Sequence, residues 1–272
     1  MLGDFVMPDN LTRLVFELQT TGSPVLIVSP HLDDGIFSAG ALLAHLAHYC
    51  PVTVLTVFTA AAPPPFWGLA ARRQMHDLGV TDAEALFEDR RAEDISVLKG
   101  IGAAWVHLGL RDALFRRVGE AAMGPPGTGW QPTYPTFRFH SGRGRIAPSD
   151  AGLAAKVRVR VDEVVQARKT EVVFAPLGVG RHVDHLITRW AVQLLELPTV
   201  YYSDFPYSET AEPDNSFIRN KALAPHPWLS GRDENTSRMA GYKTQFPGLF
   251  PNGAPTRPEI YWISTKDSMT DA

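Results

Sequence analysis

The chain has 272 residues, a formal net charge of −3 and an apolar fraction of 44%. This length suits one large α/β domain with insertions or two small domains, and the small net charge gives no support for a nucleic-acid or membrane-surface partner. Cys50, the single cysteine, excludes an internal disulfide and a thiolate-rich metal site. No apolar run is long enough to span a bilayer, and the first residues lack the pattern of a signal peptide, so we expect a cytoplasmic protein.

Strands and helices are predicted to alternate along the chain. Short apolar runs rich in β-branched residues indicate buried strands, and apolar residues at helical spacing indicate helices. In chain order the predicted elements are strand 25–29, helix 36–49, strand 52–58, helix 84–101, strand 105–108, helix 150–168, strand 172–175, helix 184–195 and strand 199–202. This order predicts an α/β fold, with a mostly parallel sheet, helices on both faces and right-handed crossovers.

One long segment interrupts this alternation. Residues 113–148 are rich in Gly and Pro and carry several aromatic side chains, Trp130 and Phe137 among them. Loops of this length are usually either lids or disordered, and disordered segments are poor in aromatic residues. We therefore predict a single domain over residues 1–272 with a lid or binding wall at about 113–148. A surface loop packed on its own aromatic side chains is the alternative.

The first polar motif is SPHLDD at residues 29–34, directly after the first predicted strand. Its side chains should lie at the carboxyl end of a buried strand, which is where open α/β sheets bind ligands. Asp33 and Asp34 also precede a predicted helix, where aspartate often accepts backbone N–H groups as an N-cap. Capping accounts for one aspartate and leaves the other, together with His31, without a role.

A second polar motif, HVDH at residues 182–185, begins a later predicted helix. Taken alone, its histidines could be solvated. Taken with the first motif, His31, Asp34 and His185 make a set of two imidazoles and one carboxylate. A catalytic zinc site uses three protein ligands and an open fourth position, and ligation by nitrogen and oxygen suits zinc without excluding other divalent metals. The two motifs therefore predict a zinc hydrolase, with one aspartate free to act as a base.

The two motifs resemble the PHPDDE and HxDH signatures of the LmbE/PIG-L zinc-dependent N-deacetylases. Weaker matches extend along most of the chain: residues 90–102 fit RxxE…LG, residues 108–112 fit LGLxD, residues 242–245 fit YxSQ and residues 259–262 fit ExYW. The resemblance implies a Rossmann-like fold with zinc at the carboxyl edge of the sheet. The chain departs from the family at Leu32, in place of proline, and at Gly35, in place of glutamate. The second departure removes a carboxylate that would support the metal ligands.

The resemblance also implies a role for each residue of the two motifs. The implied ligands of one Zn²⁺ per chain are His31, Asp34 and His185. Asp33 becomes the general base, and a protonated His182 becomes the acid or electrophilic partner at the oxyanion. Asp184 is the candidate to orient His182, with a favourable helix N-terminal charge as its alternative role.

Four residues are expected to contact the substrate, namely Asp112, Arg90, Trp130 and Phe137. Asp112 could instead be a turn residue, and Arg90 a charge on a helix surface. The aromatic residues of segment 113–148 favour a bulky, partly apolar aglycone over a free monosaccharide, because stacked aromatic rings suit large ligands with apolar faces. Gly35 and the stretch YSDFPY at residues 202–207 also resemble deacetylases of glycopeptide-antibiotic sugars.

We therefore expect zinc-dependent hydrolysis of the N-acetyl or N-acyl amide of an amino sugar. The expected substrate is a small-molecule glycoconjugate, with a glucosaminyl group on a bulky natural product such as a teicoplanin-type glycopeptide. No nucleic-acid or membrane partner is expected, and the oligomeric state stays open. Two alternatives remain: a metallo-amidase acting on another amide, such as a thiol conjugate, and a non-catalytic α/β binding module.

Overall fold

A computed structural model describes residues 9–64, 67–118 and 131–266, and within them a seven-stranded mixed sheet forms the centre of the molecule. Five strands are parallel and lie in the order β3 (Ala104–Arg111), β2 (Val52–Ala60), β1 (Val25–Ser29), β4 (Val172–Pro176) and β5 (Thr199–Tyr202). The edge beyond β5 is antiparallel and contains β7 (Glu259–Ser264) and then β6 (Leu223–Trp228). The predicted α/β fold with a mostly parallel sheet is confirmed.

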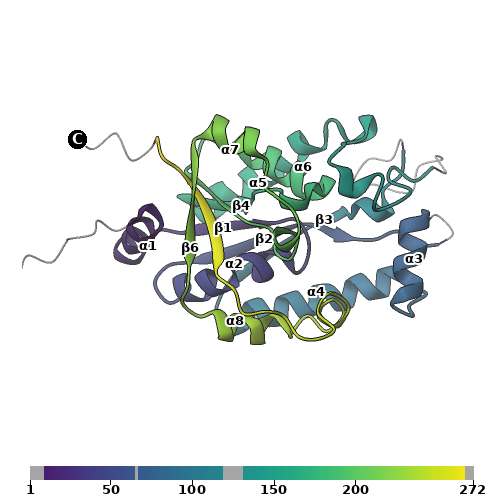
Figure 1. Cartoon of the computed structure of the whole chain (residues 1–272), viewed down its shortest axis with the longest axis horizontal. Helices are drawn as coiled ribbons and strands as arrows, with labels where there is room; N and C mark the ends of the chain where they lie inside the picture. Colours follow the sequence, from purple (N-terminus) through teal and green to yellow (C-terminus); the bar gives the residue numbers. More distant parts are fainter. Residues whose placement is uncertain (1–8, 65–66, 119–130, 267–272) are drawn as a thin grey trace, which may run out of the picture.

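Helices cover both faces of the sheet (Figure 1). One face packs against α1 (Asn10–Thr21), α2 (Asp34–Leu46), α4 (Ala83–Gly100) and α8 (Arg232–Met239). The other face packs against α5 (Leu153–Arg168), α6 (Val183–Gln193) and α7 (Asn215–Lys221). Two further helices are α3 (Leu69–Asp77), which packs in a separate small apolar cluster, and α9 (Phe246–Leu249), whose Phe246 packs against the core on the α2 face. All of the predicted strands and helices are present, with small shifts at their ends.

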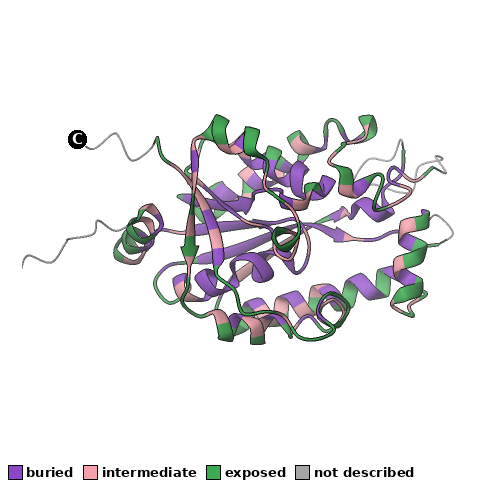
Figure 2. Ribbon diagram, in the orientation of Figure 1, coloured by how far each residue is buried: buried purple, intermediate pink, exposed green. Residues whose placement is uncertain are grey.

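The central strands are mostly apolar and are buried along almost their whole length, because helices cover both of their faces (Figure 2). In β1, Val25 and Ile27 pack into the core beneath α2, whereas Leu26 and Val28 pack into the core beneath α5 and α6. This alternation is the two-residue period of a strand. The continuous apolar run that predicted β1 therefore combines two sets of alternating residues, one on each face of the strand.

The order of the strands reverses between β1 and β4. From β1 the chain moves outward through β2 to β3, and it then returns to β4 on the other side of β1 and continues to β5. In open α/β sheets, ligands bind at such a switch point, outside the carboxyl ends of the strands. Segment 29–34 follows β1 and segment 182–185 follows β4 shortly after its end, so the fold brings both polar motifs to this point.

The segment between β3 and α5 is held in place where it is described. Short 3₁₀ helices form at Ala113–Phe115, Ser141–Arg143 and Pro148–Asp150. The buried Tyr134 hydroxyl donates to Asp150 Oδ2 at 2.8 Å. Trp130, one of the predicted substrate contacts, lies outside the described residues. The lid function of this segment stays a prediction.

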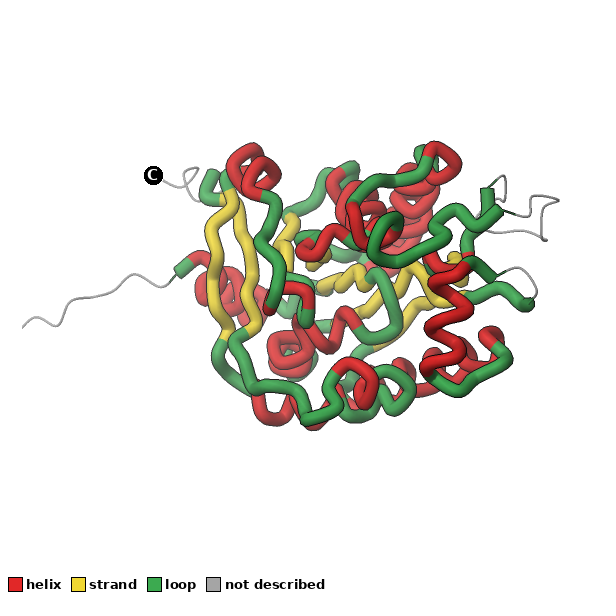
Figure 3. Tube along the Cα trace, turned by 45° about the vertical axis from the view of Figure 1, so that its right-hand side comes forward, coloured by secondary structure: helices red, strands yellow, loops and turns green. Residues whose placement is uncertain are grey.

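The antiparallel edge was not predicted from the sequence. Figure 3 shows β6 and β7 side by side at the end of the sheet. Pro225 and Pro227 lie within β6, and proline is tolerated on an edge strand because no ladder hydrogen bond is needed on its outer side. The same prolines hide the strand pattern in the sequence. Within the described part of the chain, no helix has the length and apolar character needed to cross a membrane.

Candidate metal centre

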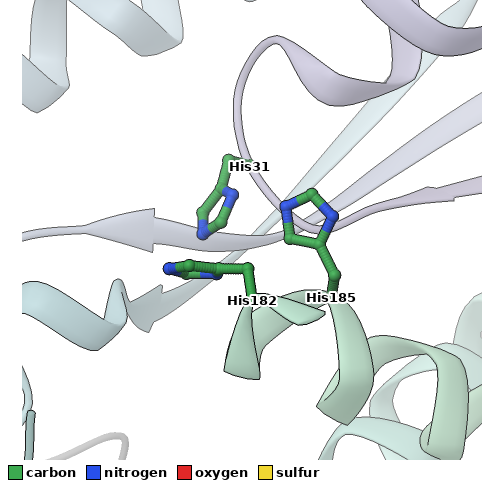
Figure 4. A group of neighbouring side chains, drawn as sticks. All are labelled: His31, His182 and His185. Atoms are coloured by element: carbon green, nitrogen blue, oxygen red, sulfur yellow. The ribbon is translucent and has the colours of Figure 1, made fainter. Parts of the chain in front are cut away.

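Three histidines meet at the switch point of the sheet. His31 lies on the loop after β1, His182 directly precedes α6, and His185 lies in the first turn of α6. Each offers a ring nitrogen, and these three atoms lie within 4.8 Å of one another (Figure 4). The structure thus brings together the histidines of both motifs.

Asp34, the first residue of α2, lies between two of these histidines. Its Oδ2 is 3.0 Å from His31 Nδ1 and 3.3 Å from His185 Nε2. The same oxygen accepts the backbone N–H of His31 at 2.9 Å, which fixes the loop around the carboxylate. In Figure 4 a nitrogen of His31 faces a nitrogen of His185 across the site. The three predicted ligands therefore point at one common space.

A buried carboxylate lies behind each of these two imidazoles. His31 Nε2 is 3.1 Å from Asp184 Oδ2, and His185 Nδ1 is 2.6 Å from Asp204 Oδ1. A carboxylate at this position fixes the N–H on the nitrogen that faces it and leaves the other nitrogen as the ligand. The nitrogens left as ligands are His31 Nδ1 and His185 Nε2, the two that face Asp34.

This donor set fits a divalent metal ion. His185 Nε2 is buried and has no hydrogen-bond partner in the described structure, and a buried polar atom without a partner calls for a ligand. Two imidazole nitrogens and one carboxylate, with no thiolate, suit zinc and related divalent ions. A second grouping of His31 with Asp112 and Asp184 is also close enough for a metal, but Asp184 is already paired with a buried arginine.

The carboxylates around the histidines favour positive charge at this point. Burial disfavours the imidazolium of His31, but hydrogen bonds to Asp184 and Asp34 outweigh burial and raise its pKa well above the usual value. Burial likewise opposes the charge on His185, while the charge of Asp34 and the hydrogen bond to Asp204 raise the pKa of His185 to about 9. Metal binding would displace the protons between these groups, as is usual where ligands must be deprotonated.

Asp33 is a buried carboxylate without a structural role in its helix. It occupies the N-cap position of α2, yet its side chain makes no capping hydrogen bond. Burial and the adjacent charge of Asp34 raise the pKa of Asp33 to about 6. The nearest cation is Arg90, whose Nη2 is 3.9 Å from Asp33 Oδ2. A carboxylate that ionises near neutral pH, next to the metal ligands, has the properties of a general base.

His182 differs from its expected protonation state. Burial lowers the pKa of His182 to about 3, although the charge of Asp184 opposes this effect. The imidazole is therefore neutral and can donate from one nitrogen only, rather than from the imidazolium expected from the sequence. Its Nδ1 is buried without a hydrogen-bond partner among the described residues. The Phe137 ring stacks on it, with the ring centroids 5.6 Å apart.

The predicted orientation of His182 by Asp184 is not what the structure contains. The hydrogen bonds of Asp184 link it to His31 Nε2, to the backbone N–H of Ala113 and to Arg116. None of these hydrogen bonds goes to His182, on which Asp184 acts only through its charge, against the effect of burial on the pKa of His182. Asp184 still supports the metal centre, but through a different histidine.

Arg116 was not identified from the sequence, and it organises the buried side of the site. Its side chain donates to Asp184 Oδ1, to Asp150 Oδ2 at 2.9 Å and to the carbonyl oxygen of Arg111 at 2.8 Å. Burial would raise the pKa of Asp184, but the Arg116 charge outweighs burial and lowers it. Arg116 thus keeps the partner of His31 ionised. No local motif distinguishes it from the many surface arginines.

Three of the four predicted substrate contacts lie close to the metal centre, and the fourth, Trp130, lies outside the described residues. Asp112 Oδ2 is 3.6 Å from His31 Nε2, and its other oxygen caps the turn at Leu114, as its alternative role predicts, while its contact with substrate stays a prediction. Arg90 is buried, beside Asp33. Phe137 lies over His182.

Gly35, which departs from the family pattern, lies in tight surroundings. A Cβ at this position would lie 3.3 Å from both Cβ and Oγ of Ser29. The Gly35 N–H donates to Ser29 Oγ at 2.9 Å, and Ser29 Oγ donates to the carbonyl oxygen of His31 at 2.6 Å. A serine hydroxyl thus supports the loop that carries His31.

The fold and the site together define an α/β protein with a metal-binding centre at the switch point of its sheet. The chain belongs to the GlcNAc-PI de-N-acetylase (PIG-L) family, whose model matches residues 26–195. This match includes both polar motifs and ends before Asp204.

Two curated relatives are similar in sequence, and both are named 2'-N-acetylparomamine deacetylase. The Streptomyces fradiae protein is 33% identical over 190 residues, which cover 67% of this chain and 57% of that protein. The match therefore spans less than two thirds of that relative. The Niallia circulans protein is 27% identical over 278 residues, which cover 90% of this chain and 92% of that protein.

Solved structures share the fold. A zinc-inhibited form of teicoplanin deacetylase matches with a TM-score of 0.70 and 23% identity, over 88% of this chain and 97% of that chain. The A40926 pseudoaglycone deacetylase matches with a TM-score of 0.62 and 24% identity, over 88% of this chain and 96% of that chain.

Proposed function

We propose that this chain hydrolyses the N-acetyl amide of an amino sugar, with one Zn²⁺ held by His31, Asp34 and His185. One observation carries the proposal: two imidazoles, each backed by a buried carboxylate, face a single aspartate, while Asp33 stands beside them without a capping bond. Family membership supports the same chemistry, and so do the names of the two curated relatives.

The residues around the metal have different roles in the proposed reaction. When bound, zinc would polarise the amide carbonyl and lower the pKa of a water from about 15.7 towards about 7. Asp33 would accept a proton from the attacking water while the water oxygen bonds to the carbonyl carbon. The neutral His182 donates a hydrogen bond to the oxyanion that forms. Asp33 then returns the proton to the amide nitrogen, the C–N bond breaks, and acetate and the free amino sugar leave.

The remaining contacts orient the sugar. Asp112 lies beside His31 and Arg90 beside Asp33, where a carboxylate and a guanidinium can hydrogen-bond to sugar hydroxyls. Phe137 offers an apolar face beside His182. Together with segment 113–148 as a binding wall, these residues favour a glucosaminyl group attached to a bulky aglycone, such as a glycopeptide.

The test is a panel of N-acetylglucosamine conjugates incubated with the zinc-loaded protein, with acetate release measured by mass spectrometry. We expect acetate release, and faster release from bulky conjugates than from N-acetylglucosamine itself. Preference for the simple sugar or its inositol conjugate would reject the bulky aglycone. Absence of acetate release from every conjugate would reject the deacetylase, and cleavage of a thiol conjugate alone would favour the metallo-amidase.

A further inference from the structure

Several large apolar side chains that are exposed to solvent gather in one pocket. They are Leu69 (62% exposed), Phe137 (45%), Phe139 (62%) and Leu249 (46%). The pocket has a volume of about 760 Å³, which lies in the range of small-molecule binding sites. Isolated exposed apolar side chains are ordinary, but a contiguous group of them marks a binding surface.

Three segments form the walls of this pocket. They are α3, residues 136–139 and the stretch 244–249 that contains α9. In Figure 1, α3 lies at the end of the molecule towards which the parallel strands run, opposite β6. The Ala70 N–H donates to the carbonyl oxygen of Pro135 at 2.9 Å, and Thr244 donates through its backbone N–H and its hydroxyl to Glu93 of α4. These bonds hold the walls against each other and against the core.

The pocket adjoins the metal centre at two residues. Phe137 lines the pocket and stacks on His182. Leu114 also lines the pocket, and its N–H is capped by Asp112, whose other oxygen is 3.6 Å from His31 Nε2. A ligand that spans both sites would place a polar group at the histidines and an apolar group between α3 and α9.

The charges at the rim restrict which apolar ligands fit. Arg73 and Asp77 form an exposed ion pair, with Arg73 Nε 3.6 Å from Asp77 Oδ2, and they largely offset each other. Arg138, the other charged lining residue, lies over the Phe139 ring, with its guanidinium carbon 5.8 Å from the ring centroid. A neutral or anionic apolar group is compatible with this rim, whereas a cationic group meets a like charge.

We propose that this pocket binds an aryl or alkyl group attached to the amino sugar and so sets the substrate preference of the enzyme. The proposal rests on the deacetylase function and assigns to it a second subsite. The occupant is neutral or anionic, and its apolar part replaces water against Leu69, Phe139 and Leu249.

The test compares methyl, phenyl and octyl β-glycosides of N-acetylglucosamine by kcat/KM for acetate release. Each methylene buried contributes about fourfold, so we expect octyl to exceed methyl by about tenfold or more. Leu69→Asp and Leu249→Asp should each reduce the octyl-to-methyl ratio about fivefold or more, because a carboxylate disfavours an alkyl chain beside it. Leu229→Asp, at a leucine that is 58% exposed outside the pocket, is the matched control and should leave the ratio unchanged.

A binding measurement separates this proposal from the catalytic one. Octyl β-glucoside carries no acetamide, so calorimetric titration of it into the zinc-loaded protein measures binding without hydrolysis. Binding that Leu69→Asp weakens and Leu229→Asp does not would support the pocket even if no acetate were released. An octyl-to-methyl ratio near one in an active enzyme, or equal effects of the two variants, would overturn the pocket and leave the deacetylase standing.

The charge of the rim has its own test. Phenyl glycosides with a para carboxylate or a para aminomethyl group differ in charge at the same position. We expect the carboxylate to be preferred by several fold, and Arg138→Gln to reduce that preference. A preference for the aminomethyl compound would contradict the assignment of a neutral or anionic occupant.

Discussion

Asp204→Asn tests whether the carboxylate behind His185 prepares that histidine for the metal. Asp204 Oδ2 accepts the N–H groups of Gly178 and Val179 at 2.7 and 2.8 Å, and Oδ1 faces His185 Nδ1 at 2.6 Å. An amide can keep the first two bonds with its oxygen, but its NH₂ group then faces Nδ1. That contact moves the imidazole proton to Nε2, the nitrogen that faces Asp34.

The expected loss of zinc affinity follows from the role of a carboxylate that orients a metal-binding histidine. Loss of the partner that orients a metal-binding histidine weakens metal affinity by about 10- to 100-fold, or about 1.4–2.7 kcal/mol. Zinc affinity is measured by competition with a chromophoric chelator, and the thermal unfolding of the chelator-treated protein shows whether the fold is retained.

Asp214→Asn is the matched control, since Asp214 caps α7 through Ser216 and Phe217 and asparagine caps equally well. Its zinc affinity should equal that of the wild type. Wild-type zinc affinity in Asp204→Asn, with the fold intact, would refute the reasoning about the tautomer of His185.

Three further predictions concern the base and the buried cation. Asp33→Asn should lower kcat by about 10²- to 10⁴-fold, because the proton acceptor is lost, and leave zinc stoichiometry by elemental analysis unchanged. In the wild type, kcat/KM should fall as the pH drops through about 6, since Asp33 accepts a proton only when it is ionised. Arg116→Gln removes the guanidinium partner that Asp184 and Asp150 share, at a cost of about 3–5 kcal/mol, and should lower the Tm measured by calorimetry by roughly 10 °C.

Each of these three predictions has an outcome that would contradict it. Full turnover by Asp33→Asn would assign the proton transfer to another group. A kcat/KM that stays constant from pH 7 to pH 4 would exclude a base whose pKa is raised by burial. An unchanged Tm in Arg116→Gln would mean that the carboxylates of Asp184 and Asp150 are protonated or solvated without the arginine. The Tm of Arg116→Lys, which keeps the charge but loses the planar fork, should lie between the Tm of the wild type and that of Arg116→Gln.

The parallel part of the fold was predictable because its strands are buried on both faces and read as apolar runs. The antiparallel edge was not, since β6 contains two prolines and its exposure alternates along the strand. The clustering of the two motifs could be predicted because each motif directly follows a strand or begins a helix, and both therefore meet at one edge of the sheet; the set of metal ligands stays a prediction. The assignment of Asp184 to His182 rested on their proximity in sequence, whereas the hydrogen bonds of Asp184 go to His31, Ala113 and Arg116.

Two residues that support the candidate metal centre were not predicted from the sequence, for different reasons. Asp204 follows β5 closely, at the same edge as His31, so the polar residue after a buried strand was a usable signal for it. Arg116 offered no such signal, because its role depends on Asp150 and Asp184, which are distant in the sequence and adjacent only in the folded chain.

The most direct test of the account is acetate release from an N-acetylglucosaminyl conjugate by the same preparation before chelation, after chelation and after zinc is restored, with bound metal measured at each stage. We predict one zinc per chain in the active protein, loss of acetate release when zinc is removed, and recovery in proportion to the zinc rebound. Undiminished acetate release by the metal-free protein would contradict the central claim.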